Sequence, residues 1–128
     1  MSFSGIQATI NFYTVEQADL TNELTGIMQD ITAAGSQTTL IADSTSKKRS
    51  LVEQTCSSGT DAYQNQMNNI ENDYELEMSK INSWENQLEV KKQQLETELQ
   101  ATTNYKESFT SALKQNVQAD FKYAQGGS

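Results

Sequence analysis

The chain of 128 residues has no proline, no histidine, one cysteine and six glycines. Proline removes a helical hydrogen bond and clashes with the preceding turn, so its absence over this length favours long uninterrupted helices. Without histidine, His-dependent zinc sites and Ser–His or Cys–His catalysis are excluded. Because Cys56 is the only cysteine, an intrachain disulfide is excluded as well.

Basic residues are also scarce, and none occurs before Lys47, whereas acidic residues begin at Glu16. The net charge of −8 argues against nucleic-acid binding, which needs a clustered basic surface. The acidic start does not fit a cleaved Sec signal or an arginine-rich transit peptide. No apolar run approaches the length of a membrane-spanning helix. We therefore expect no nucleic-acid partner, no membrane insertion, and any export to use a route without a cleaved signal.

An acidic cluster at Glu71, Asp73, Glu75 and Glu77 is the one candidate for metal or acid–base chemistry. A calcium site needs ligands that converge from a tight loop with a central glycine, and this segment has none. Paired carboxylates for glycoside chemistry would need a concave pocket, which nothing here implies. We expect a solvated acidic face, and no catalytic residue, metal, cofactor or small-molecule substrate.

The longest regular pattern runs from Ile70 to Phe121, without glycine. Its apolar residues recur mostly at spacings of three, four, seven or eleven, which indicates one face of a continuous helix. They are Ile70, Tyr74, Met78, Ile81, Trp84, Leu88, Leu95, Leu99, Phe109, Leu113, Val117 and Phe121. A lone helix with such a stripe has to bury it against a partner.

The N-terminal half is less regular. Residues 1–13 read as a flexible or docking leader with scattered apolar side chains. Thr14-Val-Glu-Gln17 resembles a capping box, which predicts that a helical arm begins there and extends over 14–56. Its apolar stripe weakens over 35–46, where the helix either breaks or continues through packing alone.

Ser57-Ser-Gly-Thr60 is the strongest turn signal inside the chain, and Asp61 follows it near a new helix start. We predict a turn at 57–60, a long C-terminal helix over 61–123 and a frayed tail at 124–128. The expected fold is all-α: an extended antiparallel helical hairpin, or coiled-coil-like bundle, with unequal arms.

Two spacings compete for the inward face of the long helix. A strict heptad through Tyr74, Leu88 and Leu95 also selects polar residues, namely Glu85, Lys92, Thr102, Lys106, Asn116 and Asp120. Eleven-residue steps such as Trp84 to Leu95 avoid many of them and fit straighter packing. The eleven-residue pattern is therefore favoured, with Trp84 on the buried stripe.

We expect the apolar stripes to make the interface through which the chain associates. The predicted interface residues are Phe3, Ile6, Ile10, Leu20, Leu24, Ile27, Ile31, Ile81, Trp84, Leu88, Leu95, Leu99, Phe109, Leu113, Val117 and Phe121. The C-terminal stripe is accompanied by Lys106, Lys114 and Lys122, which suit contact with the acidic N-terminal helix. That contact could form within one subunit or between subunits.

Taken together, these traits resemble the small axial proteins exported by flagellar and type III secretion systems, such as needle subunits and the helical core of flagellins. The shared traits are long terminal helices, an acidic sequence rich in Asn, Gln, Ser and Thr, and the absence of proline and histidine. The proline-containing turn typical of needle subunits is missing, so no residue roles carry over. The resemblance implies terminal helices that pack together and stack around an axis.

The sequence thus favours a non-enzymatic, self-assembling structural subunit of a bacterial filament or secreted appendage, whose partners are copies of itself. It would lie outside the cell or on its surface after signal-independent export, and otherwise in the cytoplasm. The alternative is an intracellular coiled-coil adaptor or secretion chaperone that binds a helical partner.

Overall fold

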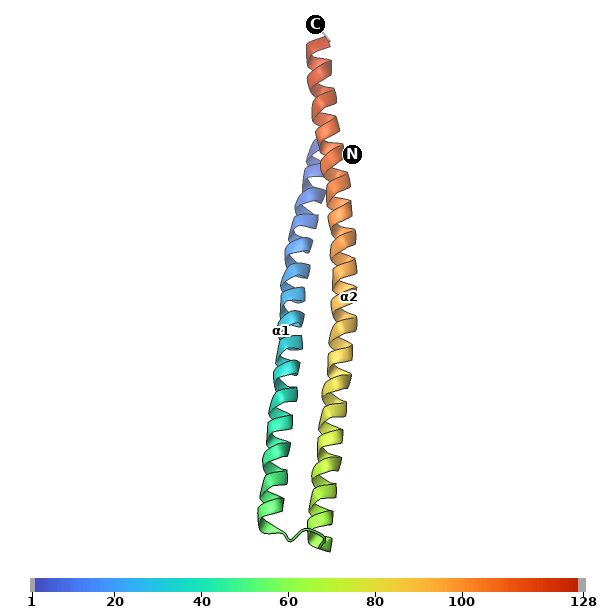
Figure 1. Cartoon of the computed structure of the whole chain (residues 1–128). Helices are drawn as coiled ribbons and strands as arrows, with labels where there is room; N and C mark the ends of the chain where they lie inside the picture. The colour runs from blue at the N-terminus through green and yellow to red at the C-terminus, as the bar shows by residue number, and fades with distance from the viewer. Residues whose placement is uncertain (1, 127–128) are drawn as a thin grey trace. The chain divides into compact units, whose positions relative to one another are not determined.

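The chain folds as an all-α antiparallel hairpin with arms of unequal length (Figure 1). A computed structural model describes residues 2–126. Helix α1 comprises Phe3–Thr55 and helix α2 comprises Asp61–Gly126, and the two pack against each other. Within residues 2–126 there is no β-strand. The predicted fold class is confirmed.

The loop between the helices covers residues 56–60 and contains the predicted turn. Gly59 has a φ of 85°, in the left-handed region that side chains other than glycine rarely adopt. Thr60 then caps α2, because its hydroxyl accepts a hydrogen bond from the Tyr63 amide at 3.2 Å. The chain therefore reverses where the sequence supplies a glycine followed by a capping threonine.

The predicted start of the first helix was wrong. Helix α1 begins at Phe3, so the part of the expected leader from residue 3 to residue 13 is helical, and Met1 lies outside the described residues. Ser2 caps this helix by accepting the Gly5 amide at 3.1 Å, whereas the Thr14 hydroxyl donates to the Ile10 carbonyl at 2.8 Å. A threonine bonded backward in this way is an interior helical residue.

Two other segments are also helical, one that the sequence left open and one that was expected to fray. Residues 35–46 continue α1 without a break, and Ile41 and Thr45 are buried within them. Packing therefore stabilises a segment whose intrinsic helix propensity is poor. At the other end, residues 124–126 belong to α2, although we expected a frayed tail; residues 127–128 lie outside the described part of the chain.

Each helix contributes to two packed units. In the terminal unit, residues 2–26 pack with residues 92–126; the loop unit comprises Ile27–Lys91. The inward side chains of both units follow the heptad spacing rather than the eleven-residue spacing. Leu88, Leu95 and Thr102, seven residues apart, are all buried, whereas Trp84 is exposed. The expectation that Trp84 shares the buried stripe with Leu95 was wrong.

Polar residues on this inward face are accommodated because most of them are only partly buried. Glu85, Lys92, Lys106 and Asn116 are half-buried, and Asp120 is exposed. Long charged side chains can pack their stems along an apolar seam and keep their charged ends in water. A seam between only two helices is shallow enough to permit this.

Two glycines should respond to alanine in opposite directions. Gly35 lies in the interior of α1, and a Cβ atom there would meet no neighbouring atom within 4 Å, so Gly35→Ala should raise the free energy of unfolding by about 0.7 kcal/mol. Gly59→Ala should lower it by about 1 kcal/mol, because alanine resists the left-handed backbone. Urea denaturation followed by circular dichroism measures both. A destabilising Gly35→Ala would indicate that a partner occupies that space.

Candidate association surface

In the terminal unit the helices meet through an aromatic cluster. The Tyr13 ring of α1 stacks with the Tyr105 ring at 5.7 Å between centroids and with the Phe109 ring at 5.9 Å. Tyr13 and Phe109 are half-buried. Stacked rings at these distances add stabilisation beyond the area that they bury. This cluster therefore contributes to the packing of the N-terminal part of α1 against α2.

A polar bridge lies one turn further along α1. The Gln17 amide donates a hydrogen bond to the Thr103 hydroxyl at 2.9 Å, and its carbonyl oxygen accepts one from the Lys106 ammonium group at 3.1 Å. An amide that both donates and accepts can satisfy two partners on the facing helix at once. Lys106 thus contacts α1 of its own chain. For this lysine, the contact within one subunit is the one that forms, of the two that the sequence left open.

In the loop unit the cross-helix contact is ionic. The Arg49 guanidinium group of α1 forms an ion pair with Glu71, and its carbon lies 5.8 Å from the centroid of the Tyr74 ring. Both charged side chains are about half exposed, so water screens the pair and its contribution to stability is small. Glu71, from the acidic cluster, therefore has a structural partner.

The structure divides the predicted interface residues into three groups. Six are buried between the helices of their unit: Ile6, Ile10, Leu20, Ile27, Leu88 and Leu95. Six are half-buried at the margins: Leu24, Ile31, Ile81, Leu99, Phe109 and Leu113. Four are exposed: Phe3, Trp84, Val117 and Phe121. Most of the predicted stripe is thus used within the hairpin, and the exposed group remains free for other contacts.

The predicted interface leaves out a second set of exposed apolar side chains on the outer faces of both helices. This set comprises Phe12, Val15, Met28, Leu40, Leu51, Leu76, Val90 and Tyr123, and Tyr105 is also exposed although its ring stacks on Tyr13. A partial signal was available, because Leu76 and Val90 lie fourteen residues apart on the face opposite the inward heptad. It could be recognised only once that heptad was accepted.

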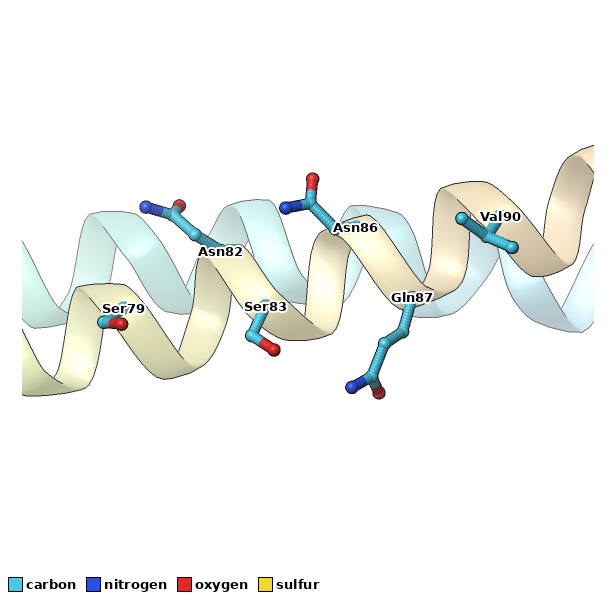
Figure 2. Close-up of a pocket in the computed structure, with 6 residues that line it drawn as sticks. All are labelled: Ser79, Asn82, Ser83, Asn86, Gln87 and Val90. Atoms are coloured by element: carbon cyan, nitrogen blue, oxygen red, sulfur yellow. The ribbon is translucent and has the colours of Figure 1, made fainter.

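The described residues do not form a recognisable chemical site. Within residues 2–126 no cluster of acidic or cysteine side chains could hold a metal ion. A surface hollow on α2, lined by Ser79, Asn82, Ser83, Asn86, Gln87 and Val90, involves successive turns of one helix only (Figure 2). Hollows of this kind do not enclose a ligand. In the described part of the chain, neither helix contains a stretch apolar enough to cross a lipid bilayer.

No protein-family model, curated protein or solved structure matches the chain. Its function therefore has to be argued from its own residues and their arrangement.

Neighbouring aromatic residues allow folding and association to be separated. Tyr13→Ala removes the ring that contacts α2 and should lower the free energy of unfolding by about 2 kcal/mol. Phe12→Ala, at a side chain that is 62% exposed, should change it by less than about 0.5 kcal/mol. Thermal denaturation of the dilute protein measures the difference. Equal losses would mean that Phe12 supports folding through its edge contact with Tyr13.

Proposed function

We propose that the chain is a non-enzymatic, self-assembling structural subunit of a bacterial filament or secreted appendage. The observation that carries this proposal is the distribution of large apolar side chains, which occur on the outer faces of both helices as well as between them. Where such side chains line up along a helix face, the exposed apolar surface marks an interaction site. The partners are copies of the same chain.

A two-helix fold explains why association is needed. Each helix has only one neighbour, so only one face of each can be covered within the hairpin. Among the described residues, no large side chain is fully buried. Packing further helices around the hairpin would bury the outer apolar side chains and gain about 25 cal/mol for each Å² of apolar area. Assembly would thus supply the core that one chain lacks.

The location and source of the proposed filament rest on the sequence. The compositional resemblance to exported axial proteins, which rests on an acidic sequence rich in Asn, Gln, Ser and Thr, supports export by a signal-independent route. A place outside the cell or on its surface follows from that route.

The test is to measure the size and shape of the purified full chain over a range of concentrations. Light scattering should show growth above a threshold concentration, and negative-stain microscopy should show long polymers of uniform width. About 0.15 M salt is suitable, because it reduces the screening length to about 8 Å and so weakens repulsion between chains of net charge −8.

A small discrete oligomer or a monomer at all concentrations would contradict the filament. A discrete oligomer is the result expected of a coiled-coil adaptor or secretion chaperone, in which the outer side chains contact one helical partner. Negative-stain images therefore separate the two classes of function directly.

A further inference from the structure

We infer that the C-terminal end of α2 in one copy docks antiparallel on the outer face of α1 in a second copy. This inference rests on the proposed self-assembly and names the contact that would produce it. The two surfaces belong to the terminal unit, and each consists of four exposed residues in a row along one helix face.

The first surface, the tail stripe, consists of Lys114, Val117, Phe121 and Ala124. All four are exposed, with Val117 49% and Phe121 61% accessible. Their spacing of three, four and three residues places them along one face of α2. Figure 1 shows why the end of this stripe lacks cover: the end of α2 continues past the first turn of α1.

The position of this overhang agrees with the contacts. Tyr13 stacks with Phe109, and the two helices run in opposite directions. Moving ten residues toward the start of α1 therefore corresponds to roughly ten residues toward the end of α2, which brings Phe3 level with about residue 119. Residues 121–126 of α2 thus extend beyond α1.

The second surface, the outer stripe, consists of Ala8, Phe12, Val15 and Asp19. All four are exposed, and Phe12 and Val15 are each more than 60% accessible. They face away from the side of α1 that carries Ile10, Tyr13 and Gln17, the residues turned toward α2. Glu16 and Glu23 add negative charge beside the stripe.

The two stripes are similar in length, because their ends lie ten and eleven positions apart, and they are complementary in charge. Placed antiparallel, they pair Ala124 with Ala8, Phe121 with Phe12, Val117 with Val15 and Lys114 with Asp19. Three apolar pairs would thus be followed by one pair of opposite charge. Opposite charges at a defined position fix the register of such a contact more than they add to its affinity.

A second copy is the occupant because the chain cannot make this contact with itself. The tail stripe belongs to a helix that is continuous from Asp61 to Gly126, and the outer stripe faces away from the side of α1 that packs on that helix. A contact between two different surfaces of identical subunits is heterologous, and when its rotation does not close it produces an open chain of subunits. The geometry therefore points to polymer growth.

The experiment compares the concentration at which polymers appear for the full-length chain and for matched variants. Phe121→Glu should raise this concentration at least about tenfold, because it places a charge in the centre of an apolar contact. Asp19→Lys and Lys114→Asp should each raise it about threefold, and the double variant should return toward the unsubstituted value. Lys91→Asp, an exposed lysine of the same helix outside the stripe, is the control.

Circular dichroism of each dilute variant should match that of the unsubstituted chain, because every substituted side chain is exposed. If Phe121→Glu polymerises normally, or if the double charge exchange gives no recovery, the inference is overturned while self-assembly stands. If the unsubstituted chain does not polymerise, the proposed function fails, and the docking contact with it.

Discussion

Leu95→Asp is expected to unfold the hairpin or abolish its assembly. The Leu95 side chain is only 6% exposed and lies in the seam between the helices of the terminal unit. An aspartate there would be an ionised group without a partner in an apolar contact, which costs about 3–5 kcal/mol. Domains of this size are stable by only about 5–15 kcal/mol, so the loss is a large part of the total. Circular dichroism and urea denaturation measure it.

Leu76→Asp is the matched control. It makes the same chemical change in the same helix, but the Leu76 side chain is 56% exposed. Its carboxylate would stay hydrated, so the free energy of unfolding should change by less than about 0.5 kcal/mol. If the two variants unfold at the same urea concentration, the inward face of α2 has been assigned wrongly.

Truncation after Gln115 should separate assembly from folding. It removes the exposed side chains of Val117, Phe121 and Tyr123 and no buried apolar residue among those described. The shortened chain should remain helical and soluble and should no longer form polymers in negative-stain images. Polymers of normal length would show that assembly uses the sides of the hairpin and not its C-terminal end.

Deletion of residues 1–12 should have a different effect, because residues 3–12 belong to α1. Ile6 and Ile10 are buried against α2, and loss of each apolar side chain from such a site costs about 2 kcal/mol or more. The deletion should therefore lower the free energy of unfolding by about 4 kcal/mol, whereas the C-terminal truncation should lower it much less. The denaturation midpoints of the two shortened chains provide the comparison.

The hairpin itself could be predicted from the sequence because its determinants are local. Without proline, both helices can run uninterrupted, and Gly59 followed by Thr60 supplies the turn and the next cap. The start of α1 could not be predicted in this way. Thr14 and Gln17 have the spacing of a capping box, but burial of Ile6 and Ile10 extends the helix past them. Tertiary packing outweighs a local hydrogen-bond pattern of this kind.

The candidate surface could be predicted only in part, because tertiary packing decides here as well. Apolar spacing identified the candidate residues for packing, but it could not assign each one to the hairpin's own seam or to its exterior. Trp84 fits an apolar periodicity and is nevertheless exposed, whereas Thr102 interrupts that periodicity and is buried. The assignment depends on which residues face the second helix, and this is set by the register of the two helices. Polar contacts such as the hydrogen bond between Gln17 and Thr103 contribute to that register.

The separation in sequence between paired residues sets an order for folding. Arg49 and Glu71 are 22 positions apart, whereas Gln17 and Lys106 are 89 positions apart. Closing the longer loop from an unfolded chain costs about 1.2 kcal/mol more in chain entropy, unless the nearer pairs have already formed. The contacts between the helices should therefore form first near residues 56–60 and then progressively toward the chain ends. The stripes proposed for docking are then completed last, so a subunit that displays them has already closed along its length.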